Sequence, residues 1–282
     1  MTERIREVAR DWLASGEVDA FIGFRRRPDG SVVPARIRDA GDVDKLVFDD
    51  ACIHNLMSYV DLKGEEKVGI LLKGCDGRAL VQLLAEGEID RERVKVLGVV
   101  CPGLKSEGAL AAKCETCRVN TPPIHDELVK GDGAEPWERD AVLDALAEIE
   151  AMSHEERAAY FKSEFDKCIR CYACRDICPL CYCEECVTEK TKPQWVEVSV
   201  KPSSNFYWHL IRAYHLAGRC VECGECDRAC PVGIPLRLLN QKLAADVERL
   251  FDYKAGADPD ATPALQEFRE DEEHVLRHGE GA

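Results

Sequence analysis

The chain has 282 residues, of which 45% are hydrophobic, and this is enough apolar material for one large or two ordinary folded domains. Its formal net charge of −15 argues against a nucleic-acid partner, because a phosphate backbone is bound by a basic face. No apolar run approaches the roughly 20 residues of a membrane span, and the N-terminus is charged where a signal peptide is apolar, so a cytoplasmic protein is expected.

Residues 1–125 have the pattern of an α/β domain. A helix is expected from Ile5 to Leu13, and an apolar run follows from Val18 to Phe24. Two continuous apolar runs, Val68–Leu72 and Val94–Val100, are typical of buried parallel strands. A helical stretch, Ala79–Leu84, lies between them and completes a βαβ unit.

Each of these two strands ends at a cysteine. Cys75 lies in the sequence Lys-Gly-Cys-Asp-Gly after the first strand, and Cys101 begins Cys-Pro-Gly after the second. Open α/β sheets bind ligands at the carboxyl ends of their strands. Both cysteines are therefore expected at the ligand-binding edge of the sheet.

The rest of the chain divides into three further regions by composition. Residues 126–165 read as a helical connector, with one helix starting at Glu135-Pro136 and another preceded by a Ser153/Glu156 capping box. Val142, Leu146 and Ile149 are expected on the buried face of the first. Residues 166–252 contain most of the cysteines, and residues 253–282 form an acidic tail that we expect to be partly helical from Gly256 onward.

The 16 cysteines are the strongest functional signal. Disulfide scaffolds are usually small and exported, so clustered cysteines in a long cytoplasmic chain are interpreted first as metal ligands. Two runs share the spacing C-x2-C-x2-C-x3-C-P of bacterial ferredoxins, in which the fourth cysteine of each run binds the other cluster. The spacing predicts two [4Fe-4S] clusters, one held by Cys168, Cys171, Cys174 and Cys230 and the other by Cys220, Cys223, Cys226 and Cys178.

Two other metal-binding interpretations fit these runs less well. Four thiolates also suit zinc, but zinc sites usually combine two separated C-x2-C pairs. Cys174, Cys178 and Cys181 match the C-x3-C-x2-C spacing of radical-SAM enzymes, yet no β/α barrel of sufficient size surrounds them. A ferredoxin-like, α+β dicluster domain with helical insertions is therefore expected after the α/β domain.

The insertion between the two runs holds three more cysteines, Cys181, Cys183 and Cys186. They could bind a further metal together with Cys52, or they could be shielding thiols, and the sequence does not decide between these. A helix is expected from about Asn205 to Ala217, ending at Gly218. Its predicted buried stripe is Phe206, Leu210, Tyr214 and Ala217, which leaves His209, Arg212 and His215 off that stripe. The two histidines are expected to be surface or supporting residues rather than metal ligands.

Cys75, Cys101, Cys114 and Cys117 form a second candidate set in the N-terminal region. A lone strand-end cysteine is most often simply buried, and a lone C-x2-C can be a redox dithiol. A helix beginning at Cys75 would favour an anionic cluster there. The residues alone leave open whether these four hold a third cluster.

Three segments of the N-terminal region carry a family resemblance. Gly74–Leu80, Val99–Gly103 and Lys113–Cys117 resemble the beta-subunit family of deazaflavin (coenzyme F420)-reducing hydrogenases and formate dehydrogenases. The segment Cys230–Pro235 resembles the ferredoxin-like modules of heterodisulfide reductase subunits. The resemblance spans residues 65–240 and implies that Cys75, Cys101, Cys114 and Cys117 ligate a third [4Fe-4S] cluster. Family members that reduce the deazaflavin carry FAD in a larger domain. This chain is short for that domain together with the ferredoxin module, and its sequence contains no Gly-x-Gly-x-x-Gly fingerprint.

Three functions follow as hypotheses. The first is an electron-transfer subunit of a hydrogenase, formate dehydrogenase or heterodisulfide-reductase-type complex, bound to a partner with a flavin or metal centre. In this hypothesis the positive charges of Lys73, Lys113 and Arg118 raise the reduction potential of the N-terminal cluster. The alternative is a catalytic flavin or iron–sulfur subunit that reduces a deazaflavin, nicotinamide or disulfide. A zinc-binding interaction module is the third, and it predicts a colourless protein.

Overall fold

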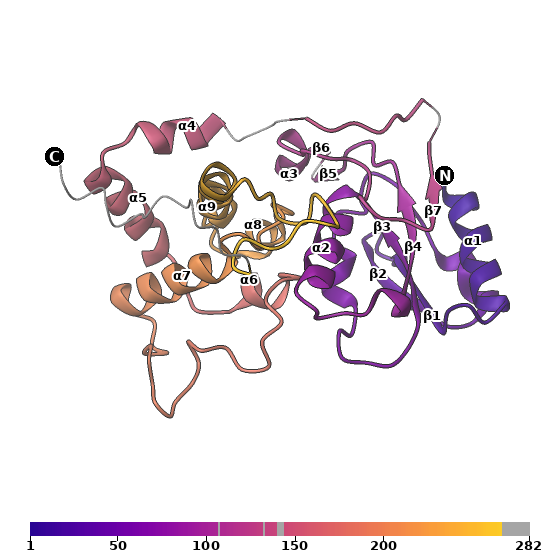
Figure 1. Ribbon diagram of the computed structural model, residues 1–282, viewed down its shortest axis with the longest axis horizontal. Coiled ribbons are helices and arrows are strands. Elements are labelled where there is room, and N and C mark those ends of the chain that lie inside the picture. The colour runs from indigo at the N-terminus through magenta and orange to yellow at the C-terminus, as the bar shows by residue number, and fades with distance from the viewer. Residues whose placement is uncertain (107, 132, 140–143, 267–282) are drawn as a thin grey trace.

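A five-stranded mixed sheet organises the N-terminal part of the chain in this computed structural model (Figure 1). The sheet order is β2-β1-β3-β4-β7, in which β2 pairs antiparallel with β1 and the remaining pairs are parallel. The strands are β1 Ala20–Arg26, β2 Val32–Ile37, β3 Val68–Leu72, β4 Val94–Val99 and β7 Glu127–Val129. The described residues are 1–106, 108–131, 133–139 and 144–266.

The two predicted central strands are found as β3 and β4, in the register Val68↔Val94. All five residues of β3 are buried, as its unbroken apolar sequence requires for a strand covered on both faces. α1 (Thr2–Ala14) and α2 (Gly74–Ala85) supply apolar side chains to the sheet core, among them Trp12 and Leu80. The carboxyl ends of β3 and β4 therefore lie side by side. The predicted strand-end cysteines follow them, Cys75 in the first turn of α2 and Cys101 in the segment after β4.

Short elements complete this part of the chain. A two-stranded hairpin, whose strands meet through Lys105 and Leu110, projects from the loop after β4. It is followed by α3, which carries Cys114. The short elements are the 3-10 helices η1 Ala40–Lys45, η2 Leu56–Tyr59 and η3 Arg91–Arg93, the strands β5 Lys105–Ser106 and β6 Ala109–Leu110, and the helix α3 Ala112–Glu115.

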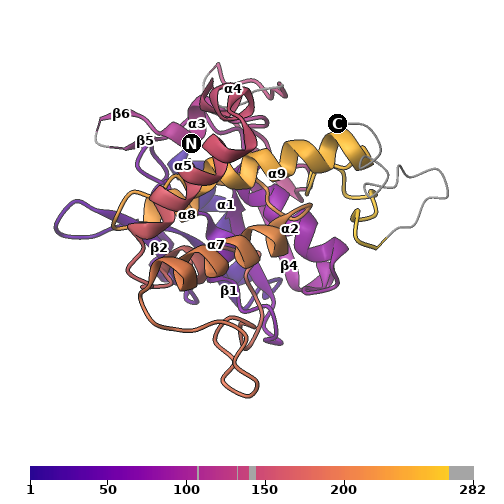
Figure 2. The same ribbon diagram turned by 90° about the vertical axis from the view of Figure 1, so that its left-hand side faces the viewer.

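The second half of the described chain is helical and packs against one end of the α/β part (Figures 1 and 2). Its own apolar core includes Phe161, Phe165, Trp208 and Leu236. The loop between the short helix α6 and α7 extends away from the rest of the chain in Figure 1. The helices are α4 Asp144–Ala151, α5 His154–Asp166, α6 Ala173–Asp176, α7 Pro202–Leu216, α8 Glu225–Ala229 and α9 Leu236–Phe251.

Two predicted helices differ from the structure. The segment around Glu135-Pro136 is not helical, because Glu138 pairs with Val119 in an isolated β-bridge, and the helix is described only from Asp144. Of its predicted buried face, Leu146 and Ile149 are buried, whereas residue 142 lies outside the described residues. The Ser153/Glu156 capping box at the start of α5 is present as predicted.

α7 exists where it was predicted, but it buries a different face. Tyr214 of the predicted stripe is 63% exposed, while His209 and Arg212 are 2% and 7% exposed. Trp208 and Leu216 supply the apolar contacts of the observed buried face. The prediction that His209 and Arg212 lie off the buried face was therefore wrong. The two polar side chains are buried because this face of α7 packs against the cysteine loops and not against a purely apolar core.

The segment after α9 returns to the N-terminal part. Tyr253 donates a hydrogen bond to Gln82 Oε1 at 2.7 Å, and Arg78 donates from Nε and Nη2 to the carbonyl of Ala255. Gly256 lies so close to Arg78 that a Cβ atom there would be 2.0 Å from the Arg78 carbonyl oxygen. The described part of the predicted acidic tail is thus packed on α2 without forming a helix, and residues 267–282 lie outside the described residues. No helix among the described residues has both the length and the apolar composition for a bilayer crossing.

Candidate iron–sulfur sites

The two ferredoxin runs repeat one backbone conformation. Arg170 and Glu222, which occupy the same position in their runs, have φ values of 56° and 59°. Tyr172 and Gly224 follow with φ values of 60° and 70°. Left-handed residues at these positions curl each loop, as a loop wound around an enclosed group requires.

Backbone amides in both runs point at cysteine sulfur atoms. The Arg170 amide donates to Cys168 Sγ at 3.4 Å, and the Glu222 amide donates to Cys220 Sγ at the same distance. The Ile234 amide donates to Cys230 Sγ at 3.4 Å. Such N–H···S contacts stabilise negative charge on sulfur, which is the form that binds iron.

The structure brings the cysteines together in the two predicted sets of four. Cys178 shares one cavity with all three leading cysteines of the second run, although it belongs to the first run. Cys230 interacts electrostatically with Cys168 and Cys174 of the first run. Each run therefore contributes its fourth cysteine to the other run's group, which is the arrangement of a two-cluster ferredoxin.

Burial raises the pKa of several thiols in these two groups. It raises the pKa of Cys174 to about 11 and that of Cys220 to about 12. A thiol in such surroundings keeps its proton until a cation replaces it, so cluster binding would release protons. The donor set of four thiols per group, with amides aimed at the sulfurs, fits [4Fe-4S] ligation.

Arg212 on α7 is a buried cation that contacts both groups. Its Nη2 donates to the carbonyl oxygen of Cys174 at 2.9 Å, and its side chain lines the cavity of the second group. Burial opposes its charge, but the thiolates of Cys178 and Cys226 together with others raise its pKa above the usual value. Sequence patterning missed this residue because a buried arginine breaks the expected apolar stripe.

Two further helical side chains hold the ligand loops. Asn205 Nδ2 donates to the Cys168 carbonyl at 2.8 Å, and Asn240 Nδ2 on α9 donates to Cys226 Sγ at 3.8 Å. The amides of buried asparagines need such partners, so α7 and α9 fix the loops that carry the cysteines.

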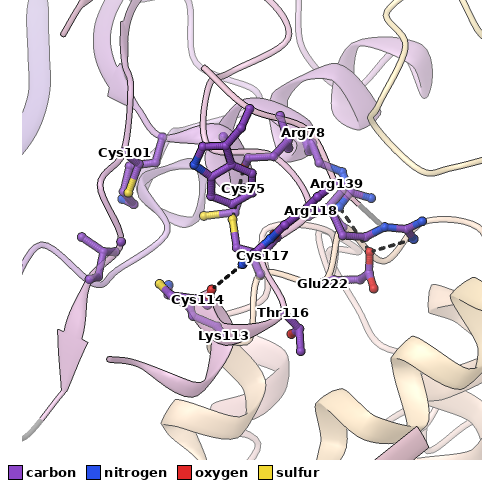
Figure 3. A pocket seen from close by; sticks show the side chains of 18 of the residues that line it. Cys75, Arg78, Cys101, Lys113, Cys114, Thr116, Cys117, Arg118, Arg139 and Glu222 are labelled. Atoms are coloured by element: carbon purple, nitrogen blue, oxygen red, sulfur yellow. Dashed lines mark hydrogen bonds and ion pairs between the residues drawn. The ribbon is translucent and has the colours of Figure 1, made fainter. Parts of the chain in front are cut away.

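The N-terminal cysteines also lie in one cavity, of about 170 Å³ (Figure 3). Cys75 comes from the first turn of α2, Cys101 from the segment just after β4, and Cys114 and Cys117 from α3 and the turn after it. Figure 3 shows these four side chains arranged around the cavity. The strand-end placement predicted from the sequence is therefore found, and four thiols around one cavity fit a third cluster.

Glycines let the backbone close this site. A Cβ atom on Gly74 would lie 2.2 Å from the Val119 carbonyl oxygen, and one on Gly77 would lie 2.3 Å from the Pro122 Cβ. Both approaches bring the segment that follows Cys117 onto α2. The Gly-Cys-Asp-Gly sequence and the later Pro-Pro sequence are thus two sides of one contact.

Two buried lysines line the N-terminal cavity. Lys73 is 1% exposed and pairs with Asp76 at 2.7 Å, so the carboxylate raises its pKa against the opposing effect of burial. Lys113 pairs with Glu225 at 3.0 Å and donates to the Ile53 carbonyl. Arg118, the third predicted cation, pairs with Glu248 at 2.8 Å at the edge of the same cavity.

The N-terminal site abuts the second ferredoxin group. Cys223 lines both the N-terminal cavity and the cavity of the second ferredoxin group. Lys113 packs closely on the second run, because a Cβ atom added to Gly224 would lie 2.8 Å from the Lys113 Cβ. Arg237 of α9 donates to the Ala112 carbonyl at 3.0 Å. These contacts were not foreseen from the sequence, because they join segments more than 100 residues apart.

The remaining cysteines divide into two places. Cys52 is fully buried in the sheet core, where it accepts from the Asp49 amide at 3.3 Å and burial raises its pKa to about 12. Cys181, Cys183 and Cys186 line a separate cavity, so the predicted option of a site shared with Cys52 is not supported by the geometry. Within the described ranges, no three His, Cys, Asp or Glu side chains converge closely enough for a single metal ion.

Comparisons with known proteins agree with this iron–sulfur geometry. Residues 164–234 match the family described as a 4Fe-4S dicluster domain. The chain is 36% identical over 104 residues to the F420-dependent formate dehydrogenase subunit beta of Methanocaldococcus jannaschii. It is 35% identical over 102 residues to the F420-dependent formate dehydrogenase 1 subunit beta of Methanococcus maripaludis.

These matches cover a limited part of each protein. Both include 36% of this chain, and they include 27% and 26% of the two relatives. The chain thus spans about a quarter of the length of the curated relatives it matches. The resemblance to iron–sulfur beta subunits of this kind is confirmed, while the activity of the whole relatives is not carried over by so short a match.

Proposed function

We propose that this chain is an electron-transfer subunit of a multi-subunit oxidoreductase, with three [4Fe-4S] clusters in a row. The N-terminal four cysteines form one end, the group of Cys178 lies in the middle, and the group of Cys230 forms the other end. The observation that carries this order is that Cys223 lines both the N-terminal cavity and the cavity of the middle group. When bound, such clusters would accept and pass on single electrons.

The chain's own residues prepare this path for electron transfer. Lys113 lies at the contact between the N-terminal and middle sites, and Arg212 lies at the contact between the middle and far sites. A buried cation between two anionic groups lowers the cost of placing them close together. Each neighbouring pair of proposed clusters therefore has at least one buried positive charge beside its ligands.

Both ends of the row reach the molecular surface. Cys171 of the far group is exposed, and the neighbouring Ile169 is 53% exposed. At the N-terminal end, Trp137 and Leu110 line the cavity and are 37% and 50% exposed. One partner would thus bind at each end, and the similarity to formate dehydrogenase beta subunits supports a flavin- or metal-containing catalytic subunit as one of them.

The test is the iron and acid-labile sulfide content of anaerobically purified protein, together with EPR of the reduced form. The double variant Cys114→Ser/Cys117→Ser is expected to lose about four irons and four sulfides relative to wild type, since a cubane contains four of each. It should also lose the magnetic interaction between the N-terminal and middle clusters. Cys52→Ala serves as the control, because Cys52 is a buried core cysteine that does not line the cavity. Unchanged iron in the double variant would refute the three-cluster row.

A further inference from the structure

A second cavity, of about 320 Å³, lies between α7 and the loop that follows the first ferredoxin run. The three cysteines that the proposed relay does not use, Cys181, Cys183 and Cys186, all line it. They come from a C-x-C-x2-C sequence, so one short turn of chain places three thiols around the same space. The cavity is larger than the N-terminal one, which measures about 170 Å³.

Three arginines contribute to the wall of this cavity. Arg212 is 7% exposed, and its Nε has no hydrogen-bond partner in the structure. Arg219 is held in place by Glu86 at 2.6 and 2.8 Å, and Arg175 is held by Asp176 at 2.8 Å. A buried guanidinium with an unused donor favours an anionic group beside it.

Cys181 also connects this cavity to the relay. It lines a neighbouring cavity together with Cys178, a ligand of the proposed middle cluster. Tyr182, the next residue, donates to Glu86 at 2.7 Å and lies under the Arg219 guanidinium, so two contacts hold the residue that follows Cys181. A group bound in this cavity would be a direct neighbour of the middle cluster.

We propose that this cavity binds a fourth [4Fe-4S] cluster through Cys181, Cys183 and Cys186. A cubane takes one thiolate at each of several irons, so its ligands surround a volume, whereas the ligands of a mononuclear ion meet at one point. Three thiols in the wall of a 320 Å³ cavity match the first arrangement. The arginines balance the negative charge of the thiolate-bound cluster. The binding of this cluster by its three cysteines does not depend on the proposed function. Only its exchange of electrons with the middle cluster, as a branch of the relay, rests on that function.

The first experiment compares metal and sulfide content in full-length protein purified anaerobically. Cys183→Ser/Cys186→Ser is expected to lose about four irons and four sulfides per chain while the signals of the two ferredoxin clusters remain. Cys114→Ser/Cys117→Ser, which removes only the N-terminal site, should lose a separate set of four. Iron content equal to wild type in the first variant overturns the fourth cluster but leaves the relay intact. Loss of zinc in place of iron overturns it as well.

A second measurement uses the unmodified chain and so does not depend on variant folding. Cys183 is exposed in the structure, so as a free thiol it would react quickly with iodoacetamide. With a cluster bound, it is expected to resist alkylation, as read by mass spectrometry, and to react after the iron has been chelated. Rapid alkylation of Cys183 in protein that retains all of its iron overturns the proposal.

Discussion

Replacing Arg212 by methionine should lower the reduction potentials of both proposed ferredoxin clusters. Reduction adds a negative charge to a cluster, and a nearby positive charge stabilises that reduced form. Arg212 donates to the carbonyl of Cys174 and lines the cavity of Cys178 and Cys226, so one change affects both sites. For a charge separation of about 8 Å and an effective dielectric constant of about 20, Coulomb's law gives about 2 kcal/mol.

This energy can be converted into a potential. Moving one elementary charge through 100 mV corresponds to about 2.3 kcal/mol, so the expected shift is about 90 mV toward more negative values. The assay is an EPR-monitored redox titration of wild type and variant. Arg212→Lys, which keeps the charge, should recover most of the shift even though the guanidinium geometry is lost.

A matched control is available on the protein surface. The Arg249 side chain on α9 is 68% exposed, so Arg249→Met removes one positive charge that is surrounded by solvent. Its effect on the potentials should be small because solvent screens it. If Arg212→Met shifts both midpoints no more than Arg249→Met does, the assignment of Arg212 as the shared cation is wrong.

Three other perturbations give distinct outcomes. Gly224→Ala should displace Lys113 and reduce the iron content of the N-terminal site, because the new Cβ atom would lie 2.8 Å from the Lys113 Cβ. Gly233→Ala controls for backbone strain, since Gly233 also has a positive φ but has open space around it. Equal iron content in both variants would contradict the contact. Asp76→Asn should lower the free energy of unfolding by about 3–5 kcal/mol in urea titrations, because it leaves the buried Lys73 ammonium without its carboxylate. Asp42→Asn, which removes one partner of an exposed ion pair, should lower it by less than about 1 kcal/mol. Equal losses in the two variants would refute the burial argument. Burial and the nearby Arg212 lower the pKa of His209 to about 3, below its unfolded value of about 6.5. Stability should therefore fall as the pH drops through 6.5, with a slope that approaches about 1.4 kcal/mol per unit as the unfolded histidine becomes fully protonated. His209→Phe should remove this contribution in unfolding measured between pH 7 and 5.5, and an unchanged slope in the variant would contradict the assignment.

The sequence predicted the features that depend on local pattern. The unbroken apolar runs gave β3 and β4 within one residue of their observed bounds, since strands buried on both faces need no polar alternation. Cysteine spacing predicted which thiols meet, and the structure groups Cys178 and Cys230 with the opposite runs. The two loops share dihedral angles because the same spacing has to enclose the same kind of space.

The features that were missed depend on what lies opposite a segment. The buried face of α7 was assigned by hydrophobicity, but it carries His209 and Arg212 because it packs on cysteine loops, where the buried Cys174 carbonyl accepts a hydrogen bond from Arg212. The turn around Glu135 was read as a helix start, yet its backbone is held by Asn120 Nδ2, which donates to the Glu135 carbonyl at 3.0 Å. No periodicity within either segment contains that information.

The return of the chain onto α2 has a consequence for the order of assembly during synthesis. α2 carries Cys75 near its start, and its Arg78 and Gln82 side chains are satisfied by Ala255 and Tyr253. Those two residues leave the ribosome only after both ferredoxin runs have been translated. The final packing of α2, and with it the support of the turn that carries Cys75, therefore has to wait until the segment after α9 has been synthesised.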